Sequence, residues 1–272
     1  MPPYNQIKIA VLSLDIVWND IERNIKAVLD AIAWMHPDTD ILVLPELFST
    51  GFIQDRDLLK EITEKQTDRV LVYLKRLSST HHIAIAGSML AKDNDNLYNR
   101  GFFVEPTGEI TCYDKRHLFC LSPESNIFSA GKLTPPVIRY RGWNISMVIC
   151  YDLRFPVWCR NKKNNADILI VPANWPMSRS YAWEHLLIAR AIENQCIVVG
   201  ANRSGEDDYG KYSGLSYIFD ATGHVIASSS AQRDRHNVDI DIIYTTYTKE
   251  ELDKTRKKLP FGNDADDFTI YL

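Results

Sequence analysis

The stretch TDILVLPEL, Thr39–Leu47, returns later in the chain as ADILIVPAN, Ala166–Asn174. Each copy is a short apolar run without strict alternation of apolar and polar residues, which is typical of a strand covered on both faces. After each copy come a helical segment, another apolar run and two strand-like segments joined at a Thr-Gly turn. This repeat predicts that the two halves of the chain share one plan.

The other elements follow from periodicity and turn residues. For the first half we expect a strand at 7–14, helices at 21–32 and 58–79, a strand at 83–90 and a hairpin turning at Thr107, Gly108 and Glu109. For the second half we expect a strand at 144–153, a helix at Tyr181–Gln195, a strand at 196–202 and a hairpin turning at Thr222, Gly223 and His224.

Covered strands with helices outside them predict an α/β fold, a four-layer alpha-beta-beta-alpha sandwich with an internal pseudo-twofold duplication. No linker rich in Gly, Ser or Pro divides the halves, so residues 1–272 are predicted to form a single domain. From about residue 247 we expect a charged helix and then a tail. This end either lies solvated on its own subunit or crosses to a second subunit.

The composition excludes several classes of protein. The chain has 272 residues, is 45% hydrophobic and carries 31 basic against 35 acidic residues. Without a basic stripe, nucleic acid is not an expected partner. The first apolar run contains Lys8 and Asp15 and is too short for a membrane span or a signal-peptide core, so we expect a cytoplasmic protein without membrane contact. The five cysteines lack Cys-x-x-Cys spacing, which favours reduced thiols over disulfides or zinc.

Three reactive side chains stand where predicted strands end: Glu46, Lys115 and Cys150. Loops at strand ends commonly form binding sites. A thiol reacts mainly as the thiolate, so Cys150 needs a nearby base, and a buried Glu46 can take its proton and return it to a leaving amine. Lys115 and the backbone N–H of Tyr151 can hold an oxyanion. Taken singly, Glu46 and Lys115 would more often form a structural ion pair and Cys150 would more often be an inert buried thiol, so the prediction rests on their combination.

Three segments resemble, in order, the signatures of the nitrilase superfamily of carbon–nitrogen hydrolases: LPELFSTGF (44–52), YDKRHLF (113–119) and VICYDLRFP (148–156). VPANWP, ARAIENQ and VVGANRSG extend the likeness to Gly205 and are most similar to the omega-amidase branch. The resemblance implies the alpha-beta-beta-alpha fold, and a homodimer or higher homo-oligomer.

The resemblance also implies a catalytic triad, with Glu46 as general base, Lys115 as oxyanion stabiliser and Cys150 as nucleophile. Glu124, in LSPESNIFSAG, matches a second glutamate that positions the lysine and the substrate in this superfamily. A solvent-facing loop carboxylate is the alternative for Glu124.

Omega-amidases hydrolyse the terminal amide of 2-oxo acid amides such as 2-oxoglutaramate, so the implied substrate has a carboxylate at its far end. Arginine binds carboxylates through two parallel N–H bonds, and Arg154 is our candidate. Its alternatives are a pair with Asp152 or a helix cap. Arg179 and Arg203 are lesser candidates.

Trp175 and Phe52 are expected to form opposite walls of the pocket, and Trp175 is equally expected as ordinary core. Pro172 aligns with Pro45 in the repeat, which places Ala173 opposite Glu46. The second half therefore lacks the acid, and we expect one active site per subunit.

The predicted function is an amidohydrolase that releases an acid and ammonia through a cysteine thioester, without metal or cofactor. Alternatives within the superfamily are hydrolysis of deaminated glutathione, an N-carbamoyl amine or a nitrile. A Cys-His hydrolase using His117 or His185, and an inactive amide-binding protein, are more distant alternatives.

Overall fold

The computed structural model describes residues 5–229, 234–237 and 240–271. The first half contains β1 (Gln6–Leu14), α1 (Ile21–Trp34), β2 (Ile41–Val43), α2 (Arg56–His81), β3 (Ala84–Asp93), β4 (Asn96–Val104), β5 (Ile110–Asp114) and α3 (Glu124–Ile127). The second half contains β6 (Ile138–Tyr140), β7 (Trp143–Met147), β8 (Ile168–Ala173), α4 (Ser180–Asn194), β9 (Ile197–Asn202), β10 (Ser204–Asp207), β11 (Gly210–Ser213), β12 (Tyr217–Phe219), β13 (Val225–Ser228), β14 (Asp234–Asn237), β15 (Ile240–Thr248) and α5 (Lys249–Lys258). Short 3-10 helices include η1 (Cys150–Arg154) and η3 (Met177–Arg179).

The sheets repeat one topology. The first has the order β14-β15-β1-β2-β3-β4-β5 and the second the order β13-β12-β9-β8-β7-β6. In the first sheet β1, β2 and β3 are parallel, and β4 and β5 continue antiparallel. In the second sheet β7, β8 and β9 are parallel, and β12 and β13 continue antiparallel. The predicted duplication is therefore present from β15 to β5 of the first sheet and from β6 to β13 of the second, with β8 in the place of β2, while β14 has no counterpart among the described strands.

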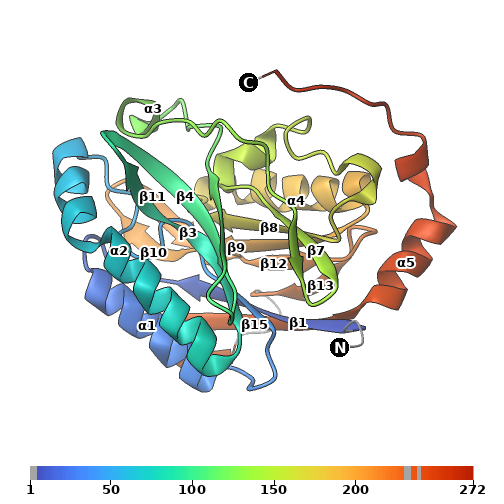
Figure 1. The fold of residues 1–272 in the computed structure, drawn as a ribbon, viewed down its shortest axis with the longest axis horizontal. Coiled ribbons are helices and arrows are strands. Elements are labelled where there is room, and N and C mark those ends of the chain that lie inside the picture. Colours follow the sequence, from blue (N-terminus) through green and yellow to red (C-terminus); the bar gives the residue numbers. More distant parts are fainter. Residues whose placement is uncertain (1–4, 230–233, 238–239, 272) are drawn as a thin grey trace.

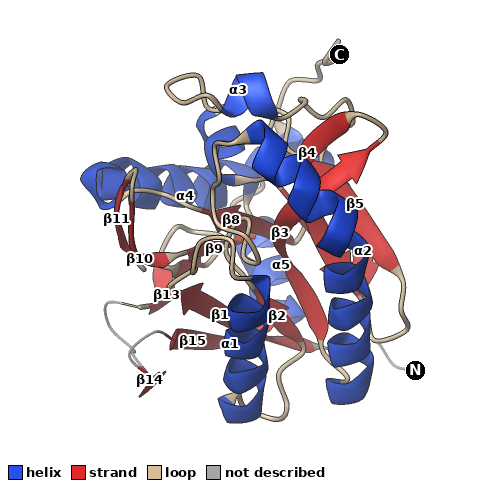
Figure 2. Cartoon of the chain, turned by 90° about the vertical axis from the view of Figure 1, so that its left-hand side faces the viewer, coloured by secondary structure: helices blue, strands red, loops and turns tan. Residues whose placement is uncertain are grey.

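Three apolar clusters make the layers. Alternate β1 residues divide between two of them, since Ile9 packs between the sheets and Leu12 packs toward α1 and α2. Figure 1 shows α1 and α2 side by side on the outside of the first sheet. The third cluster lies between the second sheet and α4 and includes Trp183 and Leu187. Figure 2 shows strands between the α1–α2 pair and α4, as the predicted alpha-beta-beta-alpha order requires.

Two parts of the fold were not expected from the sequence. β15 returns from the second half to pair antiparallel with β1 in the first sheet. β10 and β11 form a separate two-stranded ribbon between β9 and β12. Within the described ranges, no helix is long and apolar enough to cross a membrane.

The expectation that the C-terminal helix is merely solvated is wrong for one of its faces. Leu252 of α5 is fully buried in the cluster between the sheets. Arg256 donates from its NH1 group to Asp167 Oδ1 at 2.8 Å, and Lys249 pairs with the same carboxylate. The helix is therefore anchored on its own subunit, while the tail beyond it runs over the second half (Figure 1).

Candidate active site

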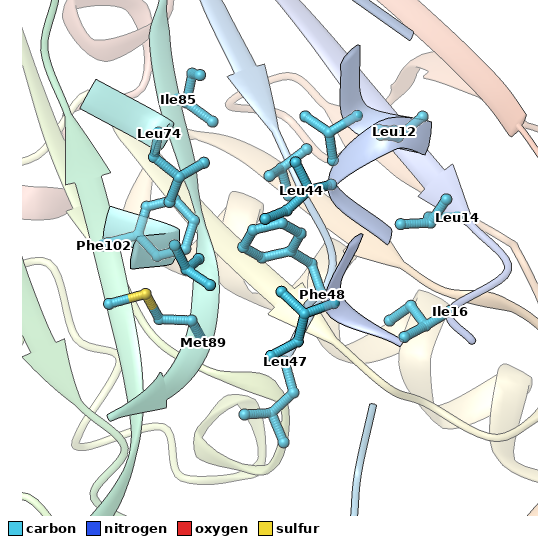
Figure 3. Close-up of a cluster of buried hydrophobic side chains, with 14 of the residues drawn as sticks. Leu12, Leu14, Ile16, Leu44, Leu47, Phe48, Leu74, Ile85, Met89 and Phe102 are labelled. Carbon is cyan, nitrogen blue, oxygen red and sulfur yellow. The ribbon is translucent and has the colours of Figure 1, made fainter. Parts of the chain in front are cut away.

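Glu46 lies in a buried turn that the core holds from both sides. The Leu47 backbone has φ 47°, in the left-handed region, and its N–H donates to Ser88 Oγ at 2.9 Å. The next side chain, Phe48, is fully buried, with its ring centroid 5.9 Å from that of Phe102 (Figure 3). This packing fixes the turn, and with it the carboxylate of Glu46.

Lys115 follows β5 directly and joins two carboxylates. Its Nζ donates to Glu46 Oε1 at 2.9 Å and to Glu124 Oε1 at 2.8 Å. The side chains of Lys115 and Glu46 are 2% exposed and that of Glu124 is 0% exposed. Burial alone would lower the pKa of Lys115, but the charges of Glu124 and Glu46 outweigh it and raise the pKa well above its usual value. The ammonium therefore stays charged as it must to stabilise an oxyanion.

Glu124 is the first residue of α3, and the alternative of a solvent-facing carboxylate is wrong. Its Oε2 accepts from the backbone N–H of Phe119 at 2.5 Å, while Oε1 accepts from Lys115. Burial raises the pKa of Glu124 and the charge of Lys115 opposes that rise. The carboxylate thus ties the loop after β5 to the lysine.

Cys150 begins η1 in a strained conformation, with φ 44°. The buried carboxylate of Asp152 holds this turn by accepting from the Ile149 N–H at 3.1 Å and from the Tyr113 hydroxyl at 2.7 Å. Its other oxygen accepts from the backbone N–H of His117 at 2.8 Å and contacts His117 Nδ1 at 2.8 Å. Tyr113 and His117 flank Lys115, so this carboxylate links the cysteine turn to the lysine segment.

These contacts decide two of the alternatives. Because Asp152 is engaged with Tyr113 and His117, it is not the partner of Arg154. His117 Nδ1 faces that carboxylate and His185 Nδ1 contacts the backbone oxygen of Tyr181. In the described part of the chain no histidine lines the cavity that Glu46, Lys115 and Cys150 share, which argues against a Cys-His hydrolase.

The thiol of Cys150 lines the same cavity as Glu46 and Lys115, whose charges act on it. Burial raises the pKa of this thiol well above its ordinary value, the charge of Glu46 raises it further, and Lys115 opposes both. The resting group is therefore a protonated thiol at neutral pH. A protonated thiol needs a base before it can act as a nucleophile, and the carboxylate of Glu46 is the candidate base in this cavity.

A cavity of about 240 Å³ opens above these groups, a size that suits a small molecule. All eight residues predicted for the site line it: Glu46, Lys115, Cys150, Glu124, Tyr151, Arg154, Trp175 and Phe52. Lining residues that sequence reasoning did not select include Gln54, Phe119, Tyr209 and Tyr212. The structure therefore brings the sequence-derived set into one place and adds to it.

Trp175 combines the two roles expected for it. It is 3% exposed and its ring centroid lies 5.3 Å from that of Trp183 in the core. Its Nε1 donates to the backbone oxygen of Arg179 at 2.8 Å. The guanidinium of Arg154 lies over its ring, 4.8 Å from the ring centroid. Trp175 is thus a core residue that also positions both arginines beside the cavity.

The three candidate arginines differ in their surroundings. Arg154 and Arg179 line the cavity, and the Arg179 guanidinium lies 5.0 Å from the ring centroid of Phe119. The prediction of Arg203 as a lesser candidate for binding the substrate carboxylate is wrong. It is fully buried and its NH1 donates to Asp207 at 2.7 Å, so its role is to hold the β10–β11 ribbon.

That ribbon supplies two of the residues that were missed, Tyr209 and Tyr212. Tyr209 lies at its turn, with its ring centroid 5.3 Å from that of Trp18 and 6.4 Å from that of Phe52. Tyr212 packs on the guanidinium of Arg203 and donates from its hydroxyl to Asp207 at 3.3 Å. The signal in the sequence was two tyrosines in an otherwise polar turn, since binding residues are common on such loops.

Comparisons with known proteins identify the family of the chain. The family model described as carbon–nitrogen hydrolase matches residues 8–257. The chain is 37% identical over 266 residues to the omega-amidase YafV of Yersinia enterocolitica, covering 97% of this chain and 98% of the relative. It is 34% identical to the 2-oxoglutaramate amidase of Bacillus subtilis, covering 92% of this chain and 98% of the relative.

Solved structures show the same fold. A CN-hydrolase superfamily protein of Xanthomonas campestris, with an arsenic adduct in its active site, has a TM-score of 0.87 and 28% identity, covering 98% of this chain and 100% of that one. An amidase of Nesterenkonia sp. has a TM-score of 0.80 and 22% identity, covering 96% of this chain and 97% of that one. The second likeness bears on the fold alone.

The raised thiol pKa gives a prediction about the resting state. Because burial raises the pKa of Cys150, its thiolate should be absent at pH 7 and appear only at strongly alkaline pH. We expect no thiolate absorbance near 240 nm in the difference between wild type and Cys150→Ala at pH 7. A thiolate band at pH 7 would show instead that the proton has already left before substrate binds.

Proposed function

This chain belongs to the carbon–nitrogen hydrolase family and is an amidase, and we propose that it hydrolyses the terminal amide of a small 2-oxo acid, such as 2-oxoglutaramate or 2-oxosuccinamate, to the acid and ammonia. The names of its omega-amidase and 2-oxoglutaramate amidase relatives support this substrate class. The cavity is small and is lined by the guanidinium groups of Arg154 and Arg179 as well as by the thiol of Cys150, which suits a short acidic amide.

One observation carries the choice of an acidic substrate. Arg154 and Arg179 line the cavity, each held beside an aromatic ring. Among the described residues neither guanidinium pairs with a carboxylate, whereas Lys115 in the same cavity pairs with two. A carboxylate at the far end of the substrate would satisfy a guanidinium through two charge-assisted hydrogen bonds. We assign this role to Arg154, with Tyr151, Trp175 and Phe52 as neighbouring walls.

The proposed first step forms a thioester. Glu46 takes the proton of the Cys150 thiol as the sulfur attacks the amide carbon. The ammonium of Lys115 and the N–H of Tyr151, which lies in the first turn of η1 where N–H groups lack helical partners, stabilise the oxyanion. Glu46 then gives its proton to the leaving nitrogen, the C–N bond breaks and ammonia departs.

The second step releases the acid. Glu46 accepts a proton from water as the water oxygen attacks the thioester carbon, and Lys115 again holds the oxyanion. When the C–S bond breaks, the proton on Glu46 returns to the sulfur of Cys150. The charges of the cluster suit this cycle. The ammonium of Lys115 balances one of the two carboxylates, Glu46 and Glu124, so one negative charge remains and Glu46 can accept one proton.

We propose further that the enzyme works in the cytoplasm and as a homodimer or higher homo-oligomer. All five cysteines are free, as a thiol nucleophile requires, and a reducing compartment keeps them so. Light scattering of the purified protein should give a mass of at least two chains. A monomer mass at micromolar concentration would remove the oligomer proposal.

Ammonia release from an amide panel tests the proposed reaction, with release of the dipeptide amine followed instead for deaminated glutathione. We expect 2-oxoglutaramate or 2-oxosuccinamate to be hydrolysed far faster than glutamine, a simple aliphatic amide, an N-carbamoyl amine, deaminated glutathione or a nitrile. Cys150→Ala should abolish the activity. Preferred turnover of one of the last three compounds would support another reaction of the superfamily, and binding without turnover would support an inactive amide-binding protein.

The role of Arg154 is tested by Arg154→Met with the same assay. A hydrogen-bonded charge contributes about 1.5–3 kcal/mol, so kcat/KM for the oxo acid amide should fall about 10- to 150-fold. A neutral aliphatic amide should lose little, because it has no carboxylate to bind. Arg139→Met, at an exposed position of β6, is the matched control and should keep both activities. Equal losses on acidic and neutral amides would contradict carboxylate recognition by Arg154.

A further inference from the structure

Asn99 of β4 contacts the catalytic carboxylate from inside the core. Its side chain is 1% exposed, and its Nδ2 donates to Glu46 Oε1 at 2.7 Å. Its backbone oxygen accepts from the Lys115 N–H at 3.0 Å. Asn99 therefore holds the general base through its side chain and the oxyanion stabiliser through its backbone.

The other half of the Asn99 amide is unsatisfied. Among the described residues Asn99 Oδ1 is buried without a hydrogen-bond partner. The orientation is fixed by chemistry, because an ionised carboxylate accepts hydrogen bonds and only the nitrogen end of the amide can donate one. An unpaired buried acceptor is destabilising, so packing does not account for an asparagine at this position.

Asn194 shows how a structural buried asparagine differs. Its Oδ1 accepts from the Asn161 N–H at 2.9 Å, and its Nδ2 donates to the backbone oxygen of Cys159 at 2.9 Å. Both halves of that amide support the backbone, away from the catalytic cavity. In Asn99, by contrast, Oδ1 has no partner among the described residues, and Nδ2 donates to Glu46.

The two oxygens of Glu46 are therefore unequal. Oε1 accepts from Asn99 Nδ2 and Lys115 Nζ, which occupies both of its lone pairs. Oε2 accepts from the backbone N–H of Asn174 at 2.8 Å and retains one lone pair. A proton transferred to the Glu46 carboxylate therefore binds to Oε2.

We propose that Asn99 is a positioning residue that makes Glu46 Oε2 the proton carrier of the reaction. The S–H bond of Cys150 breaks as an O–H bond forms at Oε2, and this O–H bond breaks as an N–H bond forms on the leaving ammonia. Without Asn99, Oε1 regains a free lone pair, and the carboxylate is held only by Lys115 Nζ and the Asn174 N–H, so both oxygens can then accept the proton. This inference rests on the proposed function, in which Glu46 is the general base.

Asn99→Leu and Asn99→Ala test the proposal with the amide that the enzyme hydrolyses fastest. A misplaced catalytic group costs on the order of 100-fold in rate, so we expect kcat to fall about 10- to 100-fold. KM should change less than about threefold, because Asn99 does not line the cavity. The two variants differ in volume and share the loss of the donor, so a common loss of kcat is assigned to that donor.

Asn194→Ala is the matched control for a structural asparagine, and Tm is measured beside the kinetics. We expect Asn194→Ala to lower Tm and to keep the wild-type kcat. We expect the Asn99 variants to have a lower kcat than Asn194→Ala even where their Tm values are similar. If the Asn99 variants follow the control pattern, with a lower Tm and wild-type kcat, the proposal is overturned.

Glu46→Gln separates this proposal from the one on which it rests. Full activity in Glu46→Gln would overturn Glu46 as the base, and with it the proposed function. An inactive Glu46→Gln together with wild-type kcat in the Asn99 variants would overturn the role of Asn99 alone.

Discussion

The proposed catalytic centre depends on the ion pairs of the buried Lys115 ammonium with two buried carboxylates. A charge in the interior is costly unless its partners lie close, and Lys115 has Glu46 at 2.9 Å and Glu124 at 2.8 Å. The two carboxylates in turn would repel each other without the lysine between them. The three groups therefore hold one another in place, and they join the turn after β2, the end of β5 and the start of α3.

The duplicated fold explains why this cluster meets a thiol. The first half supplies the carboxylates and the lysine, and the second half supplies Cys150 from the segment after β7. The sheets pack face to face through an apolar cluster, which brings these two sets of loops to one cavity. In the second copy of the repeat, Ala173 stands where the first copy has Glu46, and its neighbour Asn174 donates its N–H to the Glu46 carboxylate. The half that lacks the acid thus helps to hold the acid of the other half.

The sequence predicted the layers, and it selected residues that line one cavity, because both depend on local patterns. The repeated run at Thr39–Leu47 and Ala166–Asn174 marked equivalent strands, and the three motifs marked Glu46, Lys115 and Cys150. The pairing of β15 with β1 was not predictable in this way, because it joins the two ends of the chain. The misassignment of Arg203 has a similar cause, since a single sequence does not show that its guanidinium is enclosed with Asp207. Asn99 was missed because an asparagine within a strand carries no local signal of the carboxylate it will meet.

The central claim is that Cys150 forms a thioester with its substrate while Glu46 and Lys115 act on it from the buried cluster. Rapid-quench mass spectrometry of wild type mixed with 2-oxoglutaramate tests this claim most directly. The account predicts an acyl adduct on the peptide that contains Cys150, formed within the first turnover and absent in Cys150→Ala. Continued ammonia release by Cys150→Ala, with no adduct in the wild type, would contradict it.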